Sequence, residues 1–354
     1  MAASKLRFAR VIVVALATLL APLLAAPLAV AQGERAPDGP TLAKVRERGH
    51  LLCASSDPLP GFAQLSSENR WSGFDVDFCR AVAVAVFGDP SKMEFVALTG
   101  DSRFAQLQTG EVDLIARNAS WTMRRDTGYG ASYVAASFYD GQGFMVPASL
   151  GIVSAYQLTN LTVCVLDEGD ELASLREFFF QEQMTNVEVL YEDREDLAVA
   201  YRAGLCNVVS APASWLNAIR RGLDDPAAHR ILPERISKSV LGPVVREGDD
   251  QWFNIVKWTL FGLINAEEAG VTSLNIQSLA AAKTHRIRRL LGLEGSFGPA
   301  MGLAPEFIAN VISAVGNYGE IFDRAFGPNT GAAVARGQNA LWVNGGLLFA
   351  PSVE

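Results

Sequence analysis

Two stretches of this chain alternate short apolar strands with amphipathic helices, and this pattern constrains the fold more than any other feature. In the first stretch, strands are predicted at 51–53, 94–98 and 112–116, and the helices between them begin at Asp75 and Arg103. Strands separated by helices in this order predict a largely parallel sheet with helices packed on its faces.

The second stretch has the same order of elements. Strands are predicted at 162–166, 187–191 and 207–210, and helices at 172–180 and 196–203 separate them. A chain of 354 residues usually forms two domains, each with its own core. The simplest architecture is therefore two α/β lobes with a ligand cleft between them.

Two extended segments are predicted to connect the lobes. Residues 141–146 and 236–245 form these crossovers, and a strongly apolar helix is predicted at 252–266. Crossovers of this kind can act as hinges that let two lobes close around a ligand.

Composition excludes several classes of protein. Apolar residues make up 49% of the chain and charged residues only 19%, which is typical of a globular protein and not of a disordered one. The formal net charge of −8 argues against binding to nucleic acid or to an anionic membrane surface.

The N-terminus has the features of a secretory signal peptide. Lys5, Arg7 and Arg10 precede the apolar run 11–20, and Ala29-Val30-Ala31 is a small-x-small cleavage pattern. Cleavage is predicted after Ala31. An uncleaved anchor is the alternative, but the run is shorter than the ~20 apolar residues that a span needs. We therefore expect an exported protein without direct membrane insertion.

Four cysteines in an exported chain predict two disulfides, for which three pairings are possible. The positions of the cysteines in the predicted elements favour Cys53–Cys79 and Cys164–Cys206. The chain has no C-x-x-C motif, and its three histidines are scattered. We therefore expect neither a metal site nor a cofactor.

A small polar cluster follows the strand predicted at 112–116. It contains Ser120, Thr122 and Arg125, and Asn118 precedes them. A guanidinium offers a planar fork of donors that matches a carboxylate, and ligands usually lie at the carboxyl ends of strands in such sheets. This run is therefore a candidate half-site for a small carboxylate. The alternative is an Arg125–Asp126 ion pair on a solvated helix.

Seven segments also carry a resemblance to a known family: 59–62, 73–81, 139–146, 248–253, 264–268, 314–320 and 335–342. From about Thr41 onward, the chain resembles the periplasmic solute-binding proteins of polar amino-acid ABC importers. The similarity is greatest to the general L-amino-acid-binding subgroup, and the four cysteines stand where that subgroup has them.

The resemblance implies the type II periplasmic binding protein fold, with two α/β lobes, a ligand cleft and two crossover strands. It implies a first lobe made of 32–143 and the return segment 239–290. It further implies a second lobe at 144–238 and a C-terminal extension, 291–354, packed on the first lobe.

The resemblance also assigns roles to the residues of the polar cluster. Arg125 corresponds to the arginine that grips the α-carboxylate of the ligand, and Ser120 to a nearby hydroxyl. Asn118 corresponds to a position that offers its backbone carbonyl to the ammonium, and Thr122 to the cap of the next helix.

Three apolar residues correspond to walls of the site. These are Leu59, Phe62 and Trp121. Packing inside the lobe is the alternative role for all three. Asp75 and Asp77 are expected to be acids of a helix start and not ligand groups.

The second lobe departs from the family pattern at two places. The turn that should present N–H groups to the carboxylate is acidic here, and it contains Gly169 and Asp170 as the ligand-site positions. Pro212 stands where an aspartate that pairs with the α-ammonium is expected. Both changes are expected to weaken a site for a zwitterion, unless the acids of 167–171 are solvated and point away from the cleft.

The function implied is a periplasmic receptor that traps an amino acid or a related small carboxylate. The receptor would then present the ligand to the inner-membrane permease of an ABC importer. One alternative is a sensory or adaptor protein with a degenerate site. Another is a dehydratase or lyase, but the sequence has no G-x-S-x-G and no nucleophile–base pair, so we do not expect an enzyme.

Overall fold

The computed structural model describes residues 35–354 except 56–58, 99–101, 117–119, 168–169 and 331–333. The predicted signal peptide and Asn118 and Gly169 lie outside the described residues. Arg35–Glu354 forms one compact unit. Among the helices that the structure describes, none is both long and apolar enough to cross a membrane.

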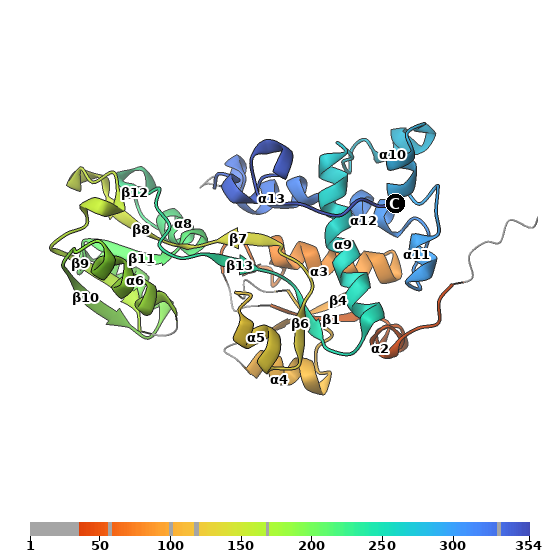
Figure 1. Cartoon of the computed structure of the whole chain (residues 1–354), viewed down its shortest axis with the longest axis horizontal. Helices are drawn as coiled ribbons and strands as arrows, with labels where there is room; N and C mark the ends of the chain where they lie inside the picture. Colours follow the sequence, from red (N-terminus) through yellow and green to blue (C-terminus); the bar gives the residue numbers. More distant parts are fainter. Residues whose placement is uncertain (1–34, 56–58, 99–101, 117–119, 168–169, 331–333) are drawn as a thin grey trace, which may run out of the picture. The chain divides into compact units, whose positions relative to one another are not determined.

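The first lobe is built on a five-stranded sheet in the order β4-β1-β5-β14-β6 (Figure 1). Strands β1 (Leu51–Ser55), β4 (Met93–Ala97) and β5 (Leu114–Ile115) pair in parallel, and β14 (Val244–Arg246) pairs antiparallel with both β5 and β6 (Ala131–Tyr133). The other elements of this part are α2 (Pro40–Arg48), β2 (Gln64–Leu65), β3 (Trp71–Ser72), α3 (Phe74–Phe87), α4 (Ser102–Thr109) and α5 (Met123–Gly128).

The start of α3 depends on a glycine. Gly73 has a φ of 132°, and a Cβ at this position would lie 2.3 Å from the carbonyl oxygen of Phe62. A residue with a Cβ is therefore excluded at position 73, because its backbone would be strained and its Cβ would clash with Phe62. Asp75 and Asp77 follow in the first turn of α3, as predicted from the favourable interaction of acids with a helix N-terminus.

The second lobe has a five-stranded sheet in the order β10-β9-β11-β8-β12. Its parallel strands are β9 (Leu161–Leu166), β10 (Asn186–Tyr191) and β11 (Val208–Pro212), and β8 (Gln142–Pro147) pairs antiparallel with both β11 and β12 (His229–Ile231). Each parallel strand is followed by a helix, namely α6 (Asp170–Gln181), α7 (Arg194–Arg202) and α8 (Ala213–Arg221). The N-termini of these helices therefore lie at the carboxyl edge of the parallel strands.

The expectation of a largely parallel sheet is thus confirmed, because four strands of each sheet run in one direction and one runs against them. The two reversed strands are β14 and β8, and each directly follows a crossover segment along the chain. A parallel neighbour needs a long crossover, usually a helix, whereas an antiparallel strand does not.

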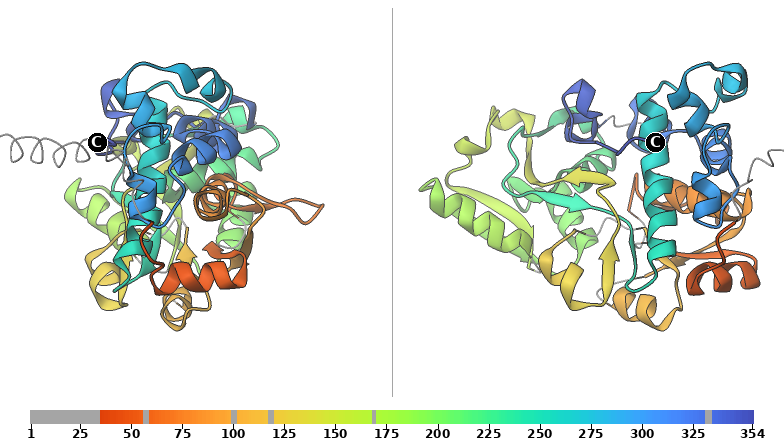
Figure 2. Two further views of the ribbon diagram at one scale, coloured as in Figure 1. Left: turned by 90° about the vertical axis from the view of Figure 1, so that its right-hand side faces the viewer. Right: turned by 45° about the vertical axis from the view of Figure 1, so that its right-hand side comes forward.

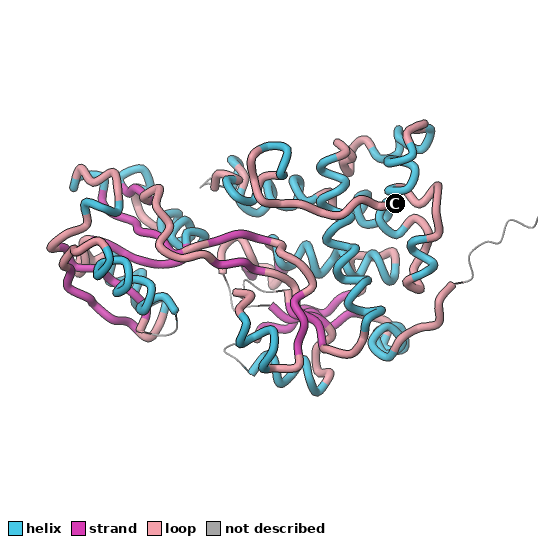
Figure 3. Tube along the Cα trace, viewed as in Figure 1, coloured by secondary structure: helices cyan, strands magenta, loops and turns pink. Residues whose placement is uncertain are grey.

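The two lobes are connected by a two-stranded ribbon (Figures 1 and 3). It consists of β7 (Phe138–Asp140) and β13 (Ser239–Leu241), which pair in antiparallel register with Tyr139 opposite Val240. The prediction that 141–146 is the crossover is therefore wrong in position. That run forms β8 of the second sheet, because Phe144, Met145 and Val146 are fully buried and need cover on both faces.

Five helices follow β14 toward the C-terminus. They are α9 (Asp250–Glu268), α10 (His285–Leu290), α11 (Phe297–Ala300), α12 (Phe307–Val315) and α13 (Tyr318–Phe326). Helix α3 contacts α9, α12 and α13, and α9 runs beside α12 and α13 (Figure 2). Phe326 of α13 lies with its ring centre 5.0 Å from that of Phe62. The C-terminal helices therefore share one apolar core with the first lobe.

Both predicted disulfides are confirmed. Cys53 of β1 is bonded to Cys79 of α3, and Cys164 of β9 is bonded to Cys206, which precedes β11. The Cα atoms are 6.0 Å apart in the first pair and 5.8 Å apart in the second. Each bond therefore links elements of a single lobe.

Candidate functional site

Arg125 lies in the first turn of α5, directly after the end of a sheet strand and its loop. Thr122 is the N-cap of this helix, and its Oγ1 accepts a hydrogen bond from the backbone N–H of Arg125 at 3.3 Å. The predicted capping role of Thr122 is thus confirmed. The Arg125 side chain turns back, so that Nη1 donates to the carbonyl oxygen of Ser120 at 3.1 Å.

The guanidinium of Arg125 is left with donors to spare. In the part of the chain that the structure describes, it forms no ion pair. Asp126, the alternative partner, accepts instead from the backbone N–H of Tyr133 at 3.3 Å. The rest of the planar fork can therefore bind a ligand carboxylate.

Ser120 and Trp121 connect this half-site to the crossover ribbon. The hydroxyls of Ser120 and Ser239 are 2.7 Å apart, and the backbone N–H of Trp121 donates to the carbonyl of Val240 at 2.7 Å. The Tyr133 hydroxyl donates to the carbonyl of Ser120 at 2.9 Å. The Trp121 ring is stacked on that of Tyr133, with the ring planes only 7° apart. The backbone that presents Arg125 is thus fixed from two sides.

The remaining residues predicted for the first half-site lie in different surroundings. Trp121 keeps 38% of its surface exposed, so its ring can still contact a ligand. Leu59 is 4% exposed and Phe62 is 1% exposed. The ring centre of Phe62 lies 5.0 Å from that of Phe138, so its surroundings are those of a core residue. Ligand contact by these three residues stays a prediction.

In the second lobe, an acid lies beside Pro212 although Pro212 itself is not one. Asp140, at the end of β7, accepts hydrogen bonds from the hydroxyl and the backbone N–H of Ser214, the latter at 3.3 Å. Ser214 is in the first turn of α8, directly after Pro212. Burial raises the pKa of Asp140, and hydrogen bonds from Ser214 and Gly141 oppose this shift. A carboxylate thus lies at the helix start where the family pattern has its aspartate.

Gln142 contributes an unpaired acceptor close to this carboxylate. Its side chain is 2% exposed, and Nε2 donates to the carbonyl of Glu171 and to the hydroxyl of Ser210, both at 2.9 Å. Reversal of the amide would place two carbonyl oxygens together, so the assignment of Nε2 is fixed. The Oε1 atom is buried, and no group in the described part of the chain forms a hydrogen bond with it. A donor from a ligand would satisfy it.

The acidic turn before α6 divides into two environments. Asp167 and Asp170 are exposed, as expected if they are solvated acids at a helix start. Glu171 is half-buried, and its Oε2 has no hydrogen-bond partner among the residues that the structure describes. Burial raises the pKa of Glu171, Arg194 opposes this shift, and Asp140 and Asp170 add to it, so that the pKa is about 7.

The sequence patterns therefore missed the acceptors of the second lobe. Gln142 lies in 141–146, which the sequence predicts only as a crossover, and Asp140 directly precedes this run. Glu171 is one of the acids of 167–171, for which a solvated position at a helix start is the alternative interpretation. The signal that could have identified the first two was present: a polar residue at each of these positions interrupts an otherwise apolar extended run.

The raised pKa of Glu171 makes a prediction about stability. The folded protein holds this proton more tightly than the unfolded chain, whose ordinary pKa is 4.5. The stabilising contribution is thus fully present below pH 4.5 and is lost as the pH rises through about 7. Glu171→Gln is therefore expected to match the unaltered protein at pH 4.5 and to be more stable at pH 8, by up to about 3 kcal/mol.

Urea unfolding of the two proteins at pH 4.5, 6 and 8 measures this difference. Glu177→Gln is the matched control, because Glu177 is an exposed acid on the same helix. A stability difference for Glu171→Gln that stays the same at all three pH values would contradict the prediction.

Comparison with known proteins places this geometry in context. Residues 51–270 match the sequence profile of the bacterial extracellular solute-binding proteins, family 3. The chain is 43% identical over 332 residues to the general L-amino acid-binding periplasmic protein AapJ of Rhizobium johnstonii, and the alignment covers 93% of this chain and 97% of that protein.

Two further similarities span nearly the whole chain. The glutamate/glutamine/aspartate/asparagine-binding protein BztA of Rhodobacter capsulatus is 45% identical over 312 residues, which are 88% of this chain and 92% of that protein. The solved structure of a periplasmic binding protein from Brucella ovis with glutathione bound has a TM-score of 0.83 and 40% identity. That match covers 90% of this chain and 100% of the other.

Proposed function

Because the chain belongs to family 3 of the bacterial extracellular solute-binding proteins, we propose that it is the ligand receptor of an ABC importer. In this proposal it binds an amino acid, or a related small carboxylate with an amino group, in a cleft between its lobes. It then delivers the ligand to an inner-membrane permease. Binding requires no cofactor and no chemical step.

The observation that carries this proposal is the opposite character of the two half-sites. The first lobe offers the spare donors of Arg125, together with the hydroxyl of Ser120. The second lobe offers the carboxylate of Asp140 and the unpaired acceptors of Gln142 and Glu171. A zwitterion has a carboxylate for the first set and an ammonium for the second.

The proposed ammonium site accounts for the proline at position 212. Asp140 reaches the N-terminus of α8 from β7, so the charge that the family pattern places on the strand end is supplied by the neighbouring crossover strand. Glu171 adds a second carboxylate whose pKa an ammonium would lower again by charge pairing. Pro212 and the acidic turn before α6 both depart from the family pattern, but an acidic half-site is still present in this proposal.

The ligand class follows from what the relatives are named for. AapJ is named for L-amino acids in general, and BztA for glutamate, glutamine, aspartate and asparagine. The solved Brucella ovis protein holds glutathione, which also carries an α-amino-acid head group at its γ-glutamyl end. An α-amino carboxylate is the common element, and we propose it as the group that this protein recognises.

The place of action is proposed to be the periplasm. The relatives AapJ and the Brucella ovis protein are periplasmic by name. The basic and apolar leader at 1–31 would direct this chain to the same compartment, where the two disulfides can persist.

A thermal-shift screen with three classes of compound tests the function. The classes are α-amino acids, amines without a carboxylate, and carboxylates without an amine. We expect only the first class to raise the Tm by several degrees, because ligand at 100 times Kd adds about 2.7 kcal/mol to the stability of the folded state. An equal response to simple amines or simple carboxylates would contradict recognition of a zwitterion. A folded protein that responds to no compound would contradict the receptor function.

A further inference from the structure

The C-terminal segment 336–348 lies along the free edge of the crossover ribbon. Asn339 is only 5% exposed, and its amide pairs with one backbone residue of β7. The N–H of Tyr139 donates to Oδ1 of Asn339 at 2.7 Å, and Nδ2 of Asn339 donates to the carbonyl of Tyr139 at 2.9 Å. The side-chain amide thus provides the acceptor and donor that a neighbouring strand would provide.

The ribbon is in this way hydrogen-bonded on both of its outer edges. On the β13 edge, the carbonyl of Val240 accepts from the N–H of Trp121, which belongs to the carboxylate half-site. On the β7 edge, the partner is Asn339. Tyr139 and Val240 are opposite each other in the ribbon, so the two contacts hold the same point along its length from its two edges.

Asn339 is itself held by a set of contacts to the helices of the C-terminal part. The Nε atom of Arg336 donates to the carbonyl of Asn339 at 3.0 Å, and Nη2 pairs with Glu267 of α9 at 3.1 Å. The guanidinium also lies over the rings of Tyr318 and Phe322, at 5.2 and 4.7 Å from their centres. The position of Asn339 is therefore set by α9 and α13.

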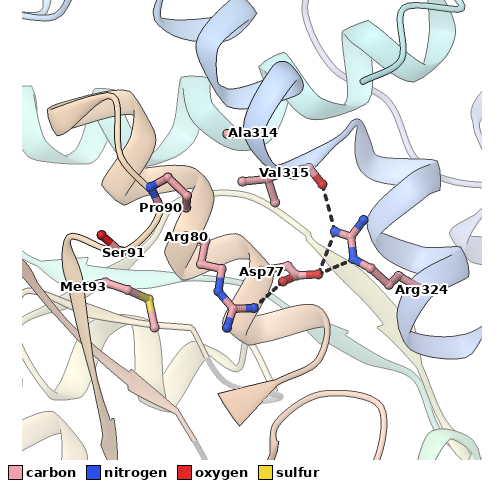
Figure 4. A pocket seen from close by; sticks show the side chains of 8 residues that line it. All are labelled: Asp77, Arg80, Pro90, Ser91, Met93, Ala314, Val315 and Arg324. Atoms are coloured by element: carbon pink, nitrogen blue, oxygen red, sulfur yellow. Dashed lines mark hydrogen bonds and ion pairs between the residues drawn. The ribbon is translucent and has the colours of Figure 1, made fainter. Parts of the chain in front are cut away.

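Helix α13 is in turn fixed to the first lobe through Asp77 (Figure 4). Arg324 of α13 donates to Oδ2 of Asp77 from Nε at 2.9 Å and from Nη2 at 2.7 Å, while Arg80 donates to Oδ1 at 2.7 Å. Asp77 is 7% exposed, so the acid expected from sequence only as a helix-start charge joins α3 to α13. The Tyr318 hydroxyl of α13 also donates to the carbonyl of Ser137, just before β7, at 2.8 Å.

From these contacts we propose that segment 336–348 is a brace for the crossover ribbon, and that Asn339 is a positioning residue for ligand binding. The brace connects the first lobe, through α13, to β7. Asp140 directly follows Tyr139, so the backbone that presents the proposed ammonium acceptor is held in place by Asn339. The positioning role rests on the proposed function, because it requires that the ribbon moves when the ligand is captured. The brace itself does not depend on that function.

Hydrogen–deuterium exchange of the ligand-free protein tests the brace without any ligand. In Asn339→Ala, the amide of Tyr139 loses its acceptor and the carbonyl loses its donor. We expect backbone amides at 137–142 to exchange at least about tenfold faster. The loss of two buried hydrogen bonds lowers the free energy that is needed to open this segment locally. Exchange in α9 and α12 should stay unchanged. Asn344→Ala, at an exposed asparagine of the same segment, is the matched control.

Asn339→Asp distinguishes hydrogen bonding from the filling of space. It has the same shape but places a carboxylate oxygen against the carbonyl of Tyr139, so we expect it to accelerate exchange at 137–142 as the alanine does. Unchanged exchange in Asn339→Asp would overturn the brace. So would faster exchange spread equally over 137–142, α9 and α12, because that pattern is general destabilisation.

Titration with L-glutamine then connects the brace to binding. We expect Asn339→Ala to raise the Kd severalfold, because ordering of the ribbon would accompany binding, while Asn344→Ala leaves it unchanged. Equal Kd values for Asn339→Ala and the unaltered protein would overturn the positioning role. If the unaltered protein binds no amino acid, the proposed function fails, while the exchange experiment still decides the brace.

Discussion

Arg125→Gln is expected to raise the Kd for an α-amino acid at least about 30-fold. Loss of a hydrogen-bonded charge partner typically costs about 2–5 kcal/mol, and each 1.4 kcal/mol is a factor of ten in affinity. The fold should tolerate the change. Only the Nη1 contact to the carbonyl of Ser120 is lost within the described residues, and the Thr122 cap uses the backbone N–H.

Isothermal titration, together with the Tm of the ligand-free protein, measures both effects. Arg124→Gln is the matched control, since Arg124 is the exposed neighbour on the same helix and carries the same charge. If Arg125→Gln binds amino acids as tightly as Arg124→Gln does, Arg125 does not clamp the carboxylate. If both variants lose affinity equally, the effect is one of net charge and the assignment to Arg125 is wrong.

Asp140→Asn is expected to weaken binding and to stabilise the protein at the same time. A charge-assisted hydrogen bond to the ligand ammonium contributes about 1.5–3 kcal/mol, so the Kd should rise about 10- to 100-fold. Burial raises the pKa of Asp140, so its charge costs stability increasingly as the pH rises through that pKa. An asparagine removes this cost and can still accept from the N–H groups of Gly141 and Ser214.

Weaker ligand binding together with higher stability distinguishes a carboxylate that binds the ligand from one that stabilises the fold. Titration at pH 8 gives the affinity, and urea unfolding at pH 5 and pH 8 gives the stability. Glu177→Gln, at an exposed acid of the second lobe, should change neither. A variant that is less stable at pH 8 and binds with unchanged affinity would show that Asp140 only closes the turn into α8.

The placement of Arg125 and of its Thr122 cap could be predicted because the information for it is local. Arg125, Thr122 and the strand before them are close in the chain, and a T-x-x-R spacing places a cap and a guanidinium on one helix turn. The disulfides were accessible for a similar reason, since each joins elements that are near neighbours in a single lobe.

The half-site of the second lobe could not be predicted in the same way. Asp140, Gln142, Glu171 and Ser214 come from four different elements, and their approach depends on the register of β8 against β11. The sequence comparison looked for an acid at position 212 because the family pattern has one there. It could not indicate that the carboxylate of a crossover strand reaches the same helix start.

What the sequence by itself determined was the order of strands and helices, the family, and the placement of Arg125 beside its Thr122 cap on one helix turn. These follow from periodicity, from caps and from motifs, all of which operate within a few residues. Only the tertiary structure decided which acids are buried, which acceptors lack a donor, and that Asn339 completes the edge of β7 across 200 positions of the chain. Burial and hydrogen-bond pairing are properties of groups brought together by folding, so no local pattern specifies them.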